Sequence, residues 1–141
     1  MTSGQIELVQ RAWGKVTALS NTYVQEVYEE LFRLSPELQA LFPQHPDLPV
    51  TKVSDTLNTV ITSLDQLDAL GFIIRDLGRR HQKFNVLPHQ FAFLKQALTL
   101  VLARRLGSNF TPELADAWSQ MYDEIAALMQ EGLSQHSESI A

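Results

Sequence analysis

The sequence predicts an all-α protein folded as a single domain, and three observations predict it. Every long segment repeats its apolar residues at helical spacing, and no segment sustains the alternation of a β-strand. The length of 141 residues suits one compact domain, and 45% hydrophobic with 19% charged residues is ordinary for globular proteins. No internal repeat and no long linker divides the chain. We therefore expect about seven helices in one domain over residues 1–133, followed by a polar tail over residues 134–141.

The first two helices are predicted from their start signals and apolar faces. The first starts after Thr2 or Ser3, and its apolar face consists of Ile6, Val9, Trp13 and Val16. The second starts near Asn21, a residue type that caps helix N-termini well. Its apolar face consists of Val24, Val27, Tyr28 and Leu31.

Proline marks the next two helix starts. Ser35-Pro36-Glu37 combines a capping residue, a first-turn proline and a first-turn acid. It opens a short helix that carries Leu38, Leu41 and Phe42. Pro43, Pro46 and Pro49 then break the chain into a loop, and a helix resumes with Asp47 as its cap and Pro49 in its first turn. Its apolar face consists of Val50, Val53, Leu57, Val60, Ile61 and Leu64.

The last three helices are predicted in the same way. The first of them presents Leu70, Ile74, Leu77 and His81 on one face. After Pro88 comes a strongly apolar helix that Gly107 ends, and its apolar face consists of Leu87, Phe91, Leu94, Leu98 and Val101. Thr111-Pro112-Glu113 opens the last helix, whose apolar face consists of Leu114, Trp118, Met121, Ile125 and Met129.

Composition and charge exclude several classes of protein. The absence of cysteine removes disulfides, thiolate nucleophiles, iron–sulfur clusters and thiolate-bound zinc. The net charge of −5 and basic groups no denser than Arg79-Arg80 and Arg104-Arg105 argue against nucleic acid or an anionic membrane as the main partner. No apolar run approaches the ~20 residues that span a bilayer, and Met1 to Gln5 lack the features of a signal peptide. We therefore expect a cytoplasmic protein with no membrane partner.

His81 is the one histidine of four that lies on a predicted core-facing stripe. At about 100° per residue, the stripe that it ends falls within an arc of about 60°. A histidine in such a place is commonly a core residue that is hydrogen-bonded to a carbonyl. The alternative is a metal on one ring nitrogen and a backbone carbonyl on the other, which is how haem proteins orient a proximal ligand. The stripe alone leaves both roles open.

The chain resembles the globins, and within them the neuroglobin-like and single-domain bacterial haemoglobins. Matching features recur in order through nearly the whole chain. They are Trp13, Leu31-Phe32 with Ser35-Pro36-Glu37, Leu41-Phe42, Leu77-Gly78-Arg79-Arg80-His81 with Val86, Leu106-Gly107, Phe110-Thr111-Pro112 and Ala117-Trp118-Ser119-Gln120-Met121-Tyr122. Each motif is weak alone, and their order and spacing together are specific.

The resemblance implies a globin fold, a three-over-three α-helical sandwich with haem b in a cleft between its layers. His81 takes the place of the proximal iron ligand, and Leu77 one turn earlier supports the proximal side. Phe42 matches the phenylalanine that packs on the haem face. The remaining pocket positions map to Val53, Val86, Phe91, Leu94 and Tyr122.

The distal side departs from the family pattern. Globins of this kind carry a distal histidine or glutamine about 32 residues before the proximal histidine, a position that falls on Pro49 here. Proline has no side-chain donor, and a small gap in the alignment would place Lys52 or Val53 there instead. We therefore expect an atypical, more open or rearranged distal pocket.

Three polar residues are candidates for the distal role. Tyr28 matches the tyrosine that donates to bound oxygen in several bacterial globins, and its alternative is a core tyrosine bonded to a carbonyl. Lys52 is expected to be solvated, where it could pair with a haem propionate. Its alternative is a sixth iron ligand, which would require the neutral amine. His45 could reach the iron from its loop in the same way.

The function implied by the resemblance is reversible binding of O2, with CO and NO, as in oxygen transport. A first alternative is haem enzymology, namely NO dioxygenation, nitrite reduction or peroxidase chemistry, with a separate reductase. A second alternative is a ligand or redox sensor. The residues do not indicate the oligomeric state.

Overall fold

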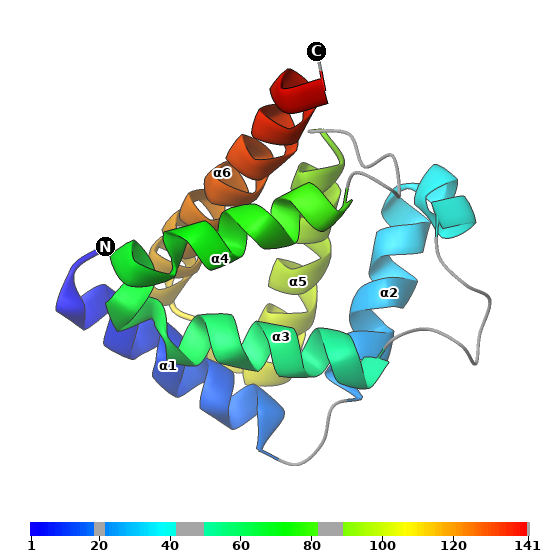
Figure 1. The fold of residues 1–141 in the computed structure, drawn as a ribbon. Coiled ribbons are helices and arrows are strands. Elements are labelled where there is room, and N and C mark those ends of the chain that lie inside the picture. Colours follow the sequence, from blue (N-terminus) through cyan, green and yellow to red (C-terminus); the bar gives the residue numbers. More distant parts are fainter. Residues whose placement is uncertain (19–21, 42–49, 82–88, 141) are drawn as a thin grey trace.

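The computed structural model describes residues 1–18, 22–41, 50–81 and 89–140 (Figure 1). The described residues form six α-helices with no β-strand among them, as the all-α prediction requires. The helices are α1 (Ser3–Thr17), α2 (Tyr23–Leu34), α3 (Val50–Thr62), α4 (Leu67–Arg80), α5 (Gln90–Leu106) and α6 (Pro112–Ile140). Helix α6 continues through the residues expected to form a polar tail, and the boundary of the domain at residue 133 stays a prediction.

The short helix predicted after Ser35 is a 3-10 helix, η1 (Pro36–Leu41). Its first turn closes with a bond of 3.0 Å from the Leu38 N–H to the Ser35 carbonyl, three residues back. Two further 3-10 turns, η2 (Leu64–Gln66) and η4 (Gly107–Asn109), join helices. The helix after Ser35 therefore lies where the sequence predicts it. It is wound as a 3-10 helix, which is tighter than an α-helix and common in short helical segments.

The predicted start and stop signals operate at three helix ends. The Thr2 hydroxyl accepts from the Gln5 N–H at 3.1 Å, and the Gln5 side chain accepts from the Thr2 N–H at 2.8 Å, which is a capping box. At α6 the Thr111 hydroxyl accepts from the Leu114 N–H at 3.2 Å. Gly107 ends α5 with a φ of 56°, a conformation that favours glycine. The predicted caps Asn21 and Asp47 lie outside the described residues.

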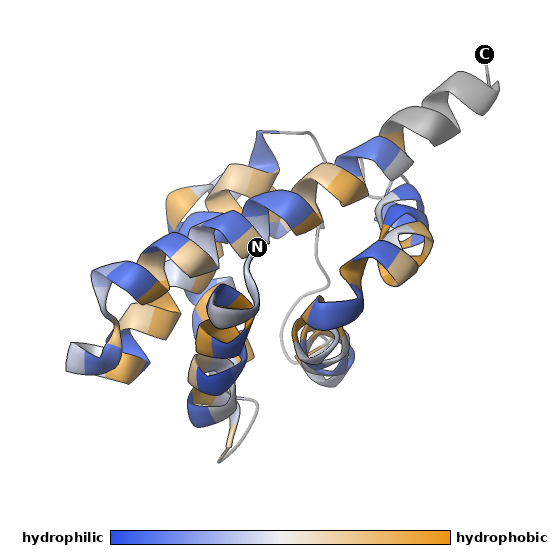
Figure 2. Cartoon of the chain, turned by 90° about the vertical axis from the view of Figure 1, so that its left-hand side faces the viewer, coloured by the Kyte–Doolittle hydropathy of each residue, from blue (hydrophilic) through white to orange (hydrophobic). Residues whose placement is uncertain are grey.

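The helices form two crossed sets. Figure 1 shows α1, α3 and α4 running across the view, while α2, α5 and α6 run steeply across them. Helix α4 packs chiefly on α6, and α2 packs chiefly on α5. The helices carry both apolar and polar residues (Figure 2), and burial of the apolar residues stabilises the crossings.

The centre of the core is aromatic. Trp13 of α1 stacks on Trp118 of α6 with ring centroids 5.9 Å apart, and it meets Tyr23 of α2 edge-on at 5.1 Å. The Trp13 indole N–H donates to the Asn58 side-chain oxygen of α3 at 2.6 Å. Both tryptophans therefore pack helices together, as the sequence predicts.

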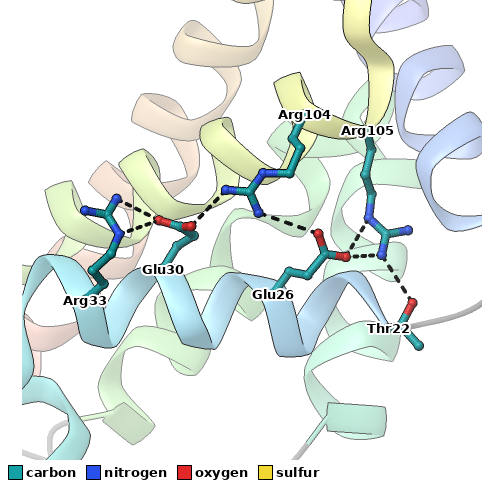
Figure 3. A network of polar contacts seen from close by, with 6 residues as sticks. All are labelled: Thr22, Glu26, Glu30, Arg33, Arg104 and Arg105. Carbon is teal, nitrogen blue, oxygen red and sulfur yellow. Dashed lines mark hydrogen bonds and ion pairs between the residues drawn. The ribbon is translucent and has the colours of Figure 1, made fainter.

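The arginines of the basic pairs noted in the sequence form ion pairs with acidic residues. Arg104 donates to Glu30 at 2.8 Å, and Arg105 donates to Glu26 at 2.9 Å, which ties the end of α5 to α2 (Figure 3). The hydrogen bond from Arg104, with one from Arg33, lowers the pKa of Glu30. Both arginines are thus paired with acids rather than clustered as a site for anions.

The arginines at the end of α4 are paired in the same way. Arg79 and Arg80 both contact Asp76 of the same helix, Arg80 at 3.3 Å. Within the described ranges, no helix combines the length and the apolar character that a membrane crossing requires.

Candidate functional site

His81 lies at the C-terminal end of α4 with its side chain half-buried. Its Nδ1 lies 2.7 Å from the Leu77 carbonyl oxygen. Because a carbonyl oxygen only accepts, Nδ1 carries the proton and donates it. In the neutral imidazole the lone pair is then on Nε2, which is the atom that would hold an iron. The donor chemistry of His81 therefore fits a haem ligand oriented by a backbone carbonyl.

The backbone of His81 is held by the same turn of helix. Its N–H donates to the carbonyls of Gly78 and Arg79, and its dihedral angles remain helical, with φ −77° and ψ −10°. Ring and backbone are thus both bonded to the last turn of α4. The direction of Nε2 consequently follows the position of that turn.

The sequence allows two roles for His81, a haem ligand and a core histidine. A carbonyl partner is expected for both roles, as the sequence analysis anticipates. A metal ion could also be held elsewhere, by a cluster of metal-ligating side chains. Within the described ranges, no group of three His, Cys, Asp or Glu side chains could hold a metal ion.

Tyr122 and Phe91, two predicted pocket residues, are in contact. The Tyr122 hydroxyl of α6 donates to the Phe91 carbonyl in the first turn of α5 at 2.5 Å. Burial raises the pKa of Tyr122, so this phenol stays protonated and continues to donate. The bond fixes the start of α5 relative to α6.

Tyr28 is buried on α2, with 6% of its surface exposed. Its ring stacks on Phe32 with centroids 5.8 Å apart. Burial raises the pKa of Tyr28 to about 12, which keeps the phenol neutral at physiological pH. Tyr28 belongs to the buried core cluster, against which Val53 of α3 and Leu94 of α5 pack with half-buried side chains.

Lys52 lies on α3 with its side chain exposed. This is the solvated position expected for it, and a role as sixth ligand stays a prediction. Three other candidates, Phe42, His45 and Val86, lie outside the described residues, as does Pro49 at the distal position.

Sequence reasoning missed the polar contacts that α3 makes with its neighbours. The buried Ser54 hydroxyl lies 3.0 Å from the Tyr23 hydroxyl of α2, and one turn later Asn58 accepts from Trp13. Ser54, Asn58 and the buried Ile61 share one face at spacings of four and three residues. That spacing was the available signal, because polar residues in line with a buried one indicate paired polar groups at a helix crossing.

Comparison with known proteins identifies the family. The Globin family model matches residues 25–129. The chain is 29% identical to a neuroglobin of Tetraodon nigroviridis, over 98% of this chain and 96% of the relative. It is 28% identical to a neuroglobin of Chaenocephalus aceratus, over 94% and 92% of the two chains, and 28% identical to Neuroglobin-1 of Oncorhynchus mykiss, over 98% and 96%. The predicted globin resemblance and all-α globin fold are confirmed, and the chain belongs to the globin family as a haem-binding, neuroglobin-like globin.

Proposed function

We propose that this protein binds O2 reversibly, and CO and NO likewise, at a haem b held by Nε2 of His81. Membership of the globin family favours a haem ligand over a core histidine, and the bond of 2.7 Å from Nδ1 to the Leu77 carbonyl then carries the proposal, because it leaves the lone pair on Nε2. His81 would hold the haem through Nε2, and the ferrous iron would supply the chemistry that binds a diatomic ligand.

The side chains that the resemblance maps to the haem pocket have two roles in this proposal. Apolar groups such as Val53 and Leu94 keep water away from the site, which slows oxidation of the iron. Tyr28 supplies a neutral hydroxyl that can donate a hydrogen bond to a ligand carrying partial negative charge.

The test of ligation removes the imidazole and returns it in solution. His81→Gly should lose the absorption spectrum of histidine-ligated haem, and added imidazole should restore it, because the free base can occupy the space left by the side chain. The matched control is His89→Ala, which removes an exposed histidine near the start of α5 and should leave the spectrum unchanged. An unaltered coordination spectrum in His81→Gly would show that another residue holds the haem.

The test of function uses the reduced wild-type protein. Its spectrum should change on exposure to O2 and return to the ferrous form when the gas is removed, through repeated cycles. Rapid conversion to the ferric form at the first exposure would contradict reversible binding, whichever residue holds the haem.

A further inference from the structure

Helices α4 and α6 approach each other closely at two glycines. A Cβ on Gly78 of α4 would overlap the backbone carbonyl of Met129 on α6. A Cβ on Gly132 of α6 would overlap the backbone carbonyl of Arg75 on α4. Any other residue at either position would therefore require the two backbones to move apart.

The two contacts are reciprocal and lie within one turn of each helix. Position 78 meets 129 and position 75 meets 132, so the helices run antiparallel here with matching spacings of three residues. On the exposed edge of the same turn, Arg75 forms an ion pair with Glu131 at 2.7 Å. Because α4 packs chiefly on α6, this crossing sets where α4 lies.

The crossing adjoins the groups that hold His81. The Gly78 carbonyl accepts from the His81 N–H, and the neighbouring Leu77 carbonyl accepts from Nδ1. A displacement of α4 at Gly78 would therefore carry both acceptors with it. The imidazole would follow, since its ring and its backbone are both bonded to that turn.

We propose that Gly78 and Gly132 are positioning residues for the haem ligand. Their backbone contact fixes the depth and direction at which His81 presents Nε2. The inference rests on the proposed ligation by His81, and it assigns a ligand-orienting role to Gly132, a residue of a different helix.

The test compares four glycine-to-alanine variants of the haem-loaded protein, two at the crossing and two controls. In Gly132→Ala we expect a shift of the iron–histidine stretching band in the resonance Raman spectrum of the ferrous form. We also expect haem transfer to an acceptor protein to quicken about tenfold, the lower end of the loss seen when groups orienting a metal ligand are removed. Gly78→Ala tests the other half of the contact and should act in the same direction.

Two control variants make the same substitution where there is room. At Gly14 of α1 a Cβ would meet nothing within 4 Å. At Gly71 of α4 itself, a Cβ would meet only the flexible guanidinium end of Arg75, with Nη1 at 3.1 Å. Both variants should keep the wild-type band position and the wild-type rate of haem transfer.

The imidazole-rescued protein separates positioning from general packing. In His81→Gly with free imidazole, the ligand is no longer attached to α4, so adding Gly132→Ala should leave the iron–nitrogen band where it is. A Gly132→Ala variant with an unshifted band overturns the proposal, even if its melting temperature falls. Unfolding of both Gly78→Ala and Gly132→Ala also overturns it, because the crossing would then serve the whole fold rather than the ligand. Failure of the ligation proposal itself would be seen separately, as an unaltered spectrum in His81→Gly.

Discussion

The phenol hydroxyls of the two tyrosines of α2, Tyr23 and Tyr28, have different surroundings. Tyr23 is bonded to the buried Ser54 hydroxyl at 3.0 Å, and that bond opposes the rise in its pKa that burial causes. Tyr28 lies five residues further on, stacked on Phe32, and burial raises its pKa. The difference allows the contribution of one hydroxyl to be tested against the other within one helix.

Tyr28→Phe should quicken the dissociation of O2 about fivefold, because one hydrogen bond contributes about 1 kcal/mol. The measurement is stopped-flow replacement of O2 by CO. Tyr23→Phe is the matched control, since it also removes one buried phenol hydroxyl from α2, and its rate should equal that of the wild type. Equal rates in both variants would mean that Tyr28 acts only in packing.

Helix α4 has sides with different surroundings. Its buried residues are Gly71, Ile74 and Gly78, and Gly78 lies against α6. By contrast, Phe72 is 69% exposed and Ile73 is 47% exposed. Adjacent residues of a helix point about 100° apart, which accounts for the contrast between Ile73 and Ile74.

Those two isoleucines provide a stability test on this element. Ile74 is 2% exposed, and Ile74→Ala should lower the free energy of unfolding by about 2–4 kcal/mol through lost burial and a remaining cavity. Ile73→Ala should change it by no more than about 0.5 kcal/mol. Urea unfolding followed by circular dichroism measures both. Similar losses in the two variants would mean that the outward side of α4 is covered in solution.

Much at the scale of the element could be predicted from the sequence, because its causes are local. The capping by Thr2 and Thr111 depends on N–H groups three residues away, and the stop at Gly107 depends on its own backbone angle. The winding of η1 was less predictable, since the same residues and the same Pro36 suit an α or a 3-10 turn.

The candidate site was predictable only in part, because some of its contacts are local and others join residues far apart in the chain. The link between His81 and Leu77 spans four residues, and helical spacing indicates it. The contact of Gly78 with Met129 joins residues far apart in the chain, and glycine in a helix gives no sign of its partner. The bond from Tyr122 to Phe91 is equally distant, so it could be known only from the packed structure.

At the scale of the whole molecule, the ion pairs between α2 and α5 contribute little to stability. Arg104 is 53% exposed beside Glu30, so solvent screens the attraction between the two charges. The buried phenols differ, because Tyr23, Tyr28 and Tyr122 all have raised pKa values, with burial as the largest cause. Because they lie on two helices, α2 and α6, we expect their ionisation to change the stability of the whole fold.

The buried phenols predict a loss of stability in alkali. A phenol whose pKa is higher in the folded than in the unfolded chain stabilises the fold fully below the unfolded value, and this contribution is lost as pH rises through the folded value. For Tyr28 the window runs from pH 10.0 to about 12, and the loss at its upper end is about 2–3 kcal/mol. Urea unfolding at pH 9 and at pH 11.5 should therefore show a smaller decrease in Tyr28→Phe than in the wild type. Since lysines and surface charges titrate alike in both proteins, an equal decrease would mean that the Tyr28 phenol ionises as readily in the folded chain as in the unfolded one.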